Sequence, residues 1–487
     1  MKKLTFVVLS MMITASSVLA GGLVTNTNQS SAWARTLTRE ASLGVDAVYY
    51  NPAGLAQLKN GLHLSLSNQS IFQTRTITSS FPAFNSAPES AYEAELAAPI
   101  FPSAYAAFKM DKWTFSGGFN IIGGGGTANF EAGLPSIESS LLALAPTTNF
   151  ILSGVDAAVE GATGTNPMFA TTSGYDMDAA FSGSSTYMGF QLGATYAIND
   201  MISVAIGGRY VMAKNTYEGS LDAMINAPVH MGGALTYPGD YVRMVATQVG
   251  MESDPALIGA ASLLDGVSKG ATVDAVQEGS GFTPIIGVNL HLTDMINIAA
   301  KYEHHTKIEM TNETTADLPD DQAMFPNGEV SRGDLPGMFS LGAQLKPIDK
   351  ISASVGLNYF LDKPAYYGVS DVDGNQINNE TSIDDNAYSL SACLEYKFLA
   401  ILGASVGYSF GNLGVNDTYQ SDMSYALKSS TLAGGVFVHL GEMMILNAGV
   451  VYVMYDDYDK AFTSPAPYSE IYGKKTTIFS IGLDISL

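Results

Sequence analysis

The sequence predicts an all-β protein, a closed antiparallel barrel of fourteen strands that crosses a membrane. Apolar and polar residues alternate along segments such as Tyr388–Phe398, so one face of each strand is apolar and the other is polar. Tight turns and long polar loops alternate between these segments. No segment after the N-terminus is an uninterrupted apolar run long enough to span a bilayer as a helix.

The N-terminal residues 1–20 are typical of a secretory signal peptide. Lys2 and Lys3 form a basic start, residues 4–13 form an apolar middle, and Val18-Leu19-Ala20 is a small-residue cleavage site. The apolar stretch is too short for a membrane-spanning helix. We therefore expect a mature chain that begins at Gly21 and is exported to the bacterial outer membrane.

The next segment, residues 21–59, does not alternate like a strand. It carries apolar residues such as Trp33 and Leu37 and ends in Asn51-Pro52-Ala53-Gly54. A segment of this length before the first strand can fold inward and obstruct the lumen. The alternative is a disordered periplasmic tail, but the apolar residues favour a packed plug. We predict a plug, or hatch, at 21–59 and the barrel at 60–487.

Fourteen alternating segments follow, and most have the ~10 residues that a tilted strand needs to cross the hydrocarbon. An even number of strands is the rule for single-chain bacterial barrels. We expect strands at Gly61–Thr78, Ser103–Lys109, Trp113–Ile122, Tyr187–Ala197, Ile202–Glu218, Thr283–Leu292, Ile296–Glu309, Met338–Lys346, Ile351–Leu361, Tyr388–Phe398, Leu402–Gly411, Lys428–Leu440, Met443–Tyr455 and Thr476–Leu487.

The connections between these strands are of two kinds. Tight turns such as Met110-Asp111-Lys112 and Ile198-Asn199-Asp200 alternate with long loops. This polarity is typical of outer-membrane barrels, in which the long loops face the outside of the cell. The loops predicted at 123–186 and 219–282 each run to about sixty residues, a length that indicates a functional role.

Composition excludes one class of partner and fits a lipid-facing barrel. The formal net charge is −23, which argues against nucleic acid, because a protein that binds a polyanion needs a basic face. Charged residues are 14% of the chain, against roughly 25% in soluble domains. The 25 tyrosines and 22 phenylalanines suit the aromatic girdles of such a barrel.

The chain carries no motif of a known catalytic or metal site. It has no Gly-x-Ser-x-Gly elbow, no His-Glu-x-x-His and no Walker-type loop. The adjacent His304 and His305 would point to opposite faces of a strand, so they would not bind one metal ion together. We expect no enzymatic activity, no catalytic residue, no cofactor and no bound metal. We also expect a monomer surrounded by outer-membrane lipid.

Together these features resemble the FadL-type outer-membrane channels for long-chain fatty acids and other hydrophobic compounds. The resemblance is carried by the plug, the tripeptide Asn51-Pro52-Ala53 before the first strand, the fourteen strands, the two long loops and the run Ala300–Lys307. It implies that a ligand is captured among the outer loops and passes to a pocket in the lumen, where basic and polar side chains meet its carboxylate. Plug movement then lets the ligand leave sideways, where strand three is kinked inward.

Four basic residues are candidates for contact with that carboxylate. Strand parity places Lys301 and Arg209 on the lumen face, and Arg35 and Arg39 lie in the plug. A guanidinium can hold a carboxylate with two parallel hydrogen bonds, and a lysine acts as a point charge. The alternative for each is an ion pair that only fixes the plug in place.

Glycines in the third strand are candidates for the inward kink. Gly117, Gly118, Gly123 and Gly124 lie in or directly after it, and glycine inside a strand marks bends and bulges. The alternative is a flexible tether into the following loop.

The sequence therefore predicts a channel for passive uptake of long-chain fatty acids or similar hydrophobic molecules. Three other functions are compatible with it. One is a channel for small aromatic hydrocarbons, which would want a lumen without a basic partner for the ligand. Another is a barrel enzyme that acts on lipids. The last is a non-transporting adhesin or structural barrel whose acidic loops bind a partner or Ca²⁺.

Overall fold

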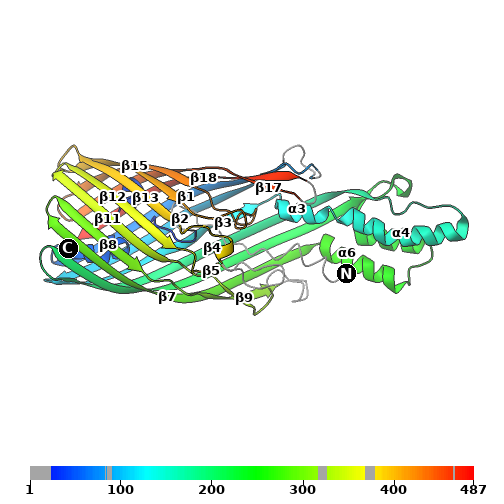
Figure 1. The fold of residues 1–487 in the computed structure, drawn as a ribbon, viewed down its shortest axis with the longest axis horizontal. Helices are drawn as coiled ribbons and strands as arrows, with labels where there is room; N and C mark the ends of the chain where they lie inside the picture. The colour runs from blue at the N-terminus through cyan, green and yellow to red at the C-terminus, as the bar shows by residue number, and fades with distance from the viewer. Residues whose placement is uncertain (1–22, 83, 85–89, 316–325, 368–378, 464–466) are drawn as a thin grey trace.

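A computed structural model describes residues 23–82, 84, 90–315, 326–367, 379–463 and 467–487. The predicted signal peptide, 1–20, lies outside these ranges. The described chain forms a closed antiparallel barrel of fourteen strands, which confirms the predicted fold class (Figure 1). The barrel closes between its first and last strands, β1 (Gly61–Ser79) and β18 (Tyr468–Ser486), which pair from His63–Ser486 to Ser79–Glu470.

The remaining strands follow one another around the wall, each paired with its neighbours in the sequence apart from short additions outside the membrane. The spanning strands are β2 (Ser90–Met110), β3 (Trp113–Phe130), β4 (Ser173–Ala197), β5 (Ile202–Asn226), β7 (Ala271–Thr293), β8 (Ile296–Glu303), β11 (Gly337–Ile348), β12 (Ile351–Leu361), β13 (Tyr388–Lys397), β14 (Leu402–Asn412), β15 (Ser429–Leu440) and β16 (Met444–Tyr455). The short additions are β6 (Leu235–Thr236), β9 (Glu309–Thr315), β10 (Val330–Arg332) and β17 (Tyr458–Phe462).

The alternation in the sequence becomes an apolar outside and a polar inside. Large apolar side chains such as Leu66, Leu192 and Ile286 are exposed on the outer face. Polar side chains such as Gln69 and Asn289 are buried within the barrel. This division is required of a barrel that meets lipid outside and protein or water inside.

Several strands extend well beyond the predicted ends, so the loops predicted at 123–186 and 219–282 are too long. β3 continues to Phe130 and β4 begins at Ser173, while β5 ends at Asn226 and β7 begins at Ala271. Outside the membrane both faces of a strand meet water or loops, so apolar alternation fades although backbone pairing continues. The Ser182-Gly183-Ser184-Ser185 run of β4 is an example.

The seventh spanning strand is broken, whereas the sequence predicted one strand at 296–309. β8 ends at Glu303, and β9 begins at Glu309. Between them Thr306 forms a bridge with Leu335, and the Ile308 backbone N–H donates to Asp334 Oδ1 at 3.0 Å. The β-ladder is interrupted here because Thr306 and Ile308 bond to Leu335 and Asp334 of the following connection.

The chain before β1 lies inside the barrel. This N-terminal segment, residues 23–58, contains α1 (Ser31–Thr36), α2 (Ala47–Tyr50) and the 3₁₀ helix η1 (Pro52–Gln57), and nearly all of it is buried. α1 contacts β13, β14, β15, β16, β18 and β1, while η1 contacts β2, β3, β4, β5 and β7. The segment therefore reaches strands on both sides of the lumen.

The longest connections carry helices beyond one end of the barrel (Figure 1). They are α3 (Pro135–Leu141), α4 (Leu144–Thr163), η2 (Val229–Met231), α5 (Pro238–Gln248) and α6 (Pro255–Ser268), and a shorter connection holds η3 (Asn379–Thr381). By length and composition alone, residues 135–163 are long and apolar enough to cross a membrane. α4 instead packs Leu152 and Val155 in one cluster with Tyr241 and Val245 of α5 and Leu264 of α6.

Candidate functional site

An ion-pair cluster joins three strands to the N-terminal segment. Arg209 on β5 donates two parallel hydrogen bonds to Glu303 on β8, from Nη1 to Oε2 at 2.6 Å and from Nη2 to Oε1 at 3.0 Å. Lys301 Nζ donates to Glu303 Oε1 at 2.5 Å and to the carbonyl oxygen of Tyr49 at 2.9 Å. Arg209 Nη2 also donates to Gln191 Oε1 on β4 at 2.7 Å. The cluster is buried, and its one carboxylate is paired with both cations.

The aromatic ring of Tyr49 lies against both cations of this cluster. Arg209 Cζ is 4.9 Å and Lys301 Nζ is 4.7 Å from its centroid, within the range of cation–π attraction. Gln191 Nε2 donates to the carbonyl oxygen of Val48, the residue before the tyrosine. Side chains from three strands, Gln191 of β4, Arg209 of β5 and Lys301 of β8, thus hold α2 against the wall.

The two other basic candidates are also engaged. Arg35 on α1 pairs with Glu395 of β13, and its Nε donates to Asn447 Oδ1 of β16 at 2.9 Å. Arg39 pairs with Asp46 inside the N-terminal segment, from Nε to Oδ2 at 2.7 Å and from Nη2 to Oδ1 at 2.6 Å. Arg35 therefore ties the segment to the wall, and Arg39 holds the segment in its own fold.

All four residues predicted to meet a ligand carboxylate thus have protein carboxylates as partners. The structure brings Arg209 and Lys301 onto one acid and places Arg35 and Arg39 in separate ion pairs. Removing one member of a buried pair leaves an uncompensated charge, so these contacts resist exchange for a ligand. Their geometry favours positioning of the N-terminal segment.

The tripeptide at Asn51 connects α2 to η1 and both to the wall. Asn51 caps η1, because its Oδ1 accepts from the Ala53 backbone N–H at 3.2 Å, and Pro52 stands at the first helical position. Asn51 Nδ2 donates to the carbonyl oxygen of Val288 on β7 at 2.9 Å. A β-carbon on Gly287 would collide with the Asn51 side chain, so the close approach requires glycine there.

β3 is irregular in its outer half. Its register with β4 shifts between Ile121 and Gly123 and again between Gly124 and Gly126. Gly124 and Gly125 have φ values of 62° and 117°, and residues 120–124 are all buried instead of alternating. Two bulges this close together bend a strand. Gly117 and Gly118, in contrast, lie in the regularly paired half, opposite Leu192 and Gln191.

The bend interrupts the wall between β2 and β3. Their pairing stops at Ala104–Phe119 and resumes at Glu95–Asn129, so the intervening residues of the two strands are not partners. We call this interval the β2–β3 break. It is packed with side chains, because β-carbons built on Gly125 and Gly126 would lie 2.5 Å from Phe101 and Leu96 of β2.

The N-terminal segment bonds to the bent part of β3. The Asn26 backbone N–H donates to the Ile122 carbonyl at 2.7 Å, and Asn26 Nδ2 donates to the Gly124 carbonyl at 2.8 Å. Gln29 Nε2 donates to the Ile121 carbonyl at 2.8 Å. Buried backbone groups need partners, and in a membrane water does not supply them. Here the segment supplies bonds at the β2–β3 break.

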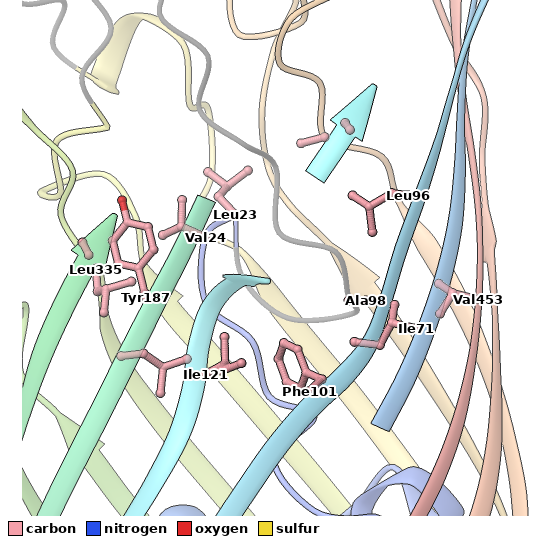
Figure 2. Packing of buried hydrophobic residues seen from close by; sticks show 14 of the residues in the cluster. Leu23, Val24, Ile71, Leu96, Ala98, Phe101, Ile121, Tyr187, Leu335 and Val453 are labelled. Carbon is pink, nitrogen blue, oxygen red and sulfur yellow. The ribbon is translucent and has the colours of Figure 1, made fainter. Parts of the chain in front are cut away.

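Apolar side chains gather inside the barrel around this break. Figure 2 shows them on the N-terminal segment, on strands on several sides and on the 333–336 connection. The members labelled there are Leu23, Val24, Ile71, Leu96, Ala98, Phe101, Ile121, Tyr187, Leu335 and Val453. An apolar cluster inside an otherwise polar barrel suits a hydrophobic ligand.

The outer helices carry exposed apolar side chains as well. Phe150 on α4 and Leu263 on α6 are 79% and 66% exposed, and Ile258 and Met244 are exposed nearby in the same helical group. Exposed apolar residues that cluster mark interaction surfaces.

Comparison with known proteins identifies the family of this chain. Residues 11–362 match the model of the outer membrane protein transport protein family (OMPP1/FadL/TodX). The chain belongs to this family. It is therefore an outer-membrane β-barrel transporter of a family that carries hydrophobic compounds. A search of curated proteins found no match.

Solved structures share the fold at low sequence identity. A FadL homologue from Pseudomonas aeruginosa is 11% identical with a TM-score of 0.61, and the match covers 96% of this chain and 100% of that one. The toluene transporters TodX from P. putida and TbuX from Ralstonia pickettii are 15% and 14% identical, with TM-scores of 0.52 and 0.51. Each of these matches covers 91% of this chain and 94% of the other.

Reasoning from the sequence missed the contacts at the β2–β3 break. Asn26 and Gln29 lie in a polar Thr/Asn/Gln stretch that has no periodicity to point to a role. A signal for the break was present in β2, where Pro99 and Pro102 lie in one strand. Proline donates no ladder hydrogen bond, so two prolines predict interrupted pairing at this place.

Proposed function

We propose that this family member takes up long-chain fatty acids or similar hydrophobic molecules by passive diffusion and releases them sideways into the membrane through the β2–β3 break. The observation that carries the proposal is the bend of β3 together with its bonds to the N-terminal segment. An interval whose strands are not paired with each other can open by moving side chains, without breaking a ladder.

The route offers apolar surface at each stage. The exposed side chains on α4 and α6 would capture the ligand outside, and the cluster around Phe101 and Ile121 would receive it within the barrel. A buried CH₂ group is worth about 0.8 kcal/mol, so a long acyl chain would enter a purely aqueous pore only at high cost.

The N-terminal segment acts as the plug in this proposal. Arg35, the Arg209–Glu303–Lys301 cluster and Asn51 would hold most of it in place. Residues 23–29 carry no charged side chain, so only hydrogen bonds and packing attach them to β3, and they contribute Leu23 and Val24 to the apolar cluster. Ligand arriving there would displace these residues and free the bent strand.

A disulfide across the break tests the exit. Leu96 and Gly126 face each other closely enough for a bridge, and the native Cys393 would be replaced by alanine. We expect oxidised Leu96→Cys/Gly126→Cys protein to lose most uptake of labelled oleate by cells, and reduction to restore it. The matched control is Ala107→Cys/Ser116→Cys, which joins the same strands where they already pair. Equal uptake by the oxidised and reduced break variant would refute lateral exit.

Small aromatic hydrocarbons are a second candidate ligand. The pairing of all four predicted basic residues with protein acids favours this reading, because none is left over for a carboxylate. Competition between oleate and toluene for uptake through the purified protein in vesicles separates the two candidates.

A further inference from the structure

Two buried cations lie side by side on the seam where the barrel closes. Arg75 of β1 and Lys474 of β18 are cross-strand partners, and both side chains face inward with 5% and 7% exposure. Within the described chain, every other arginine or lysine that is this deeply buried has a carboxylate partner. These others are Arg35, Arg209 and Lys301.

No carboxylate among the described residues lies within 4.0 Å of Arg75 or Lys474. Arg75 Nε and Nη2 are buried and have no hydrogen-bond partner there. Along β18 the nearest acid is Glu470, four residues and about 13 Å up the strand, and it accepts a bond from Tyr472 at 2.7 Å. Asp457 approaches Gly473, the residue before Lys474, but forms no ion pair with either cation. Burying charge without a partner is costly, and two like charges side by side add to that cost.

Aromatic rings line the pair without neutralising it. Arg75 Cζ is 4.5 Å from the centroid of Tyr425, and Lys474 Nζ is 5.3 Å from that of Tyr455. Cation–π contacts are attractive but leave the N–H donors of the cations available. Two cations with spare donors in an aromatic surround suit an anionic oxygen group.

The pair is continuous with the apolar cluster at the β2–β3 break. Two residues further along the strands, Gln73 donates to Thr476 at 2.9 Å, with Val453 opposite Thr476, and the next inward-facing pair is Ile71 and Ile478. Leu96, which lies against Gly126 at the break, is the cross-strand neighbour of Gln73 on β2. Ile71 and Leu96, both labelled in Figure 2, would then flank the tail of a molecule whose anionic head lies at the pair.

We propose that Arg75 and Lys474 form an anion site that takes the carboxylate of a single-chain amphiphile, with the tail directed along Ile71 and Leu96 to the break. The site rests on the proposed function and gives it a substrate class: fatty acids instead of neutral hydrocarbons. Two cations on one carboxylate would supply the charge-assisted bonds that the four paired candidates do not offer.

Binding of matched ligands to the detergent-solubilised protein tests the site. Oleate and oleyl alcohol have the same tail and differ in the charge of the head. We expect the wild type to prefer oleate, and Arg75→Gln/Lys474→Met to weaken oleate binding about 10- to 100-fold while alcohol binding stays within about 2-fold. Lys214→Met, which removes an exposed lysine, should leave both affinities unchanged.

The possible results separate this site from the proposed function. Equal losses for both ligands, or unchanged oleate binding, would overturn the anion site and leave the channel proposal standing. Absence of binding for both ligands by the wild type would overturn the two together.

A crystal structure of the wild type with 2-bromohexadecanoate provides a test that does not depend on variant folding. Its bromine lies beside the carboxylate, so the anomalous peak should appear between Arg75 and Lys474. A peak elsewhere, or inorganic anion alone at the pair, would reject the proposal.

Discussion

The Asn26 side-chain amide donates a 2.8 Å hydrogen bond to the carbonyl oxygen of Gly124, so the N-terminal segment holds β3 at its bend. The backbone N–H of the same asparagine bonds to Ile122. The interval at which β3 leaves β2 is thus secured from inside the barrel, by residues at the start of the described chain. Loss of the hydrogen-bond partner of a buried carbonyl group lowers the free energy of unfolding by about 1–3 kcal/mol.

We predict that Asn26→Ala frees the outer half of β3. Hydrogen exchange of peptides covering residues 119–130 should be about 5- to 100-fold faster than in the wild type. Asn28→Ala is the matched control, because Asn28 bonds to Gln69 of β1 at 3.0 Å and not to β3. The same acceleration in both variants would show that the bond to Gly124 has no special role.

Asn51 has two roles that one substitution can separate. Asp is as good an N-cap as Asn, but it lacks the amide that donates to Val288. We predict that Asn51→Asp lowers the free energy of unfolding by about 1–3 kcal/mol in urea titrations in detergent. Wild-type stability of Asn51→Asp would mean that capping of η1 is the whole role.

Glu303 is the single acid between two buried cations, Arg209 and Lys301. Glu303→Gln should lower the free energy of unfolding by about 3–5 kcal/mol, because it leaves both cations without a carboxylate. Glu278→Gln is the control. It breaks the exposed pair with Lys214, and its cost should stay within about 1 kcal/mol. Similar costs for both variants would contradict a central role for the cluster.

Asp362, in the connection after β12, should make stability depend on pH. Burial raises its pKa to about 6, although Tyr367 and the Ala387 backbone donate to it. The unfolded pKa is about 3.9, so the folded state binds the proton more tightly. The stabilisation is full below pH ~4 and is lost as pH rises to about 6, a change of about 2–3 kcal/mol.

Unfolding in urea at pH 4 and pH 7 checks this prediction. Asp362→Asn keeps the shape and removes the titration, so its pH dependence should be smaller than that of the wild type by this amount. Asp456→Asn, at an exposed position, should leave the wild-type dependence intact. Parallel profiles for wild type and Asp362→Asn would disprove the assignment.

The alternation along the chain was enough to predict the barrel, its fourteen strands and the side of each strand that meets lipid. A strand that faces lipid needs an apolar residue at every second position. This pattern lies within the strand itself, so it is visible along Tyr388–Phe398 without knowledge of the neighbouring strands. Where the strands leave the membrane, this requirement no longer applies. The predicted start of β4 and the predicted end of β5 therefore lie inside the observed strands.

Which charges meet depends on how the strands and the N-terminal segment pack in three dimensions. The alternation along each strand placed Arg209 and Lys301 on the lumen face. It carries no information on which residues lie opposite each other across the lumen. The acid that they share, and the ion pair of Arg35 with β13, could therefore not be predicted. Arg75 and Lys474 lie about 400 residues apart and become neighbours because the barrel closes. The break beside them arises in the same way, from how β3 packs against β2 and the N-terminal segment.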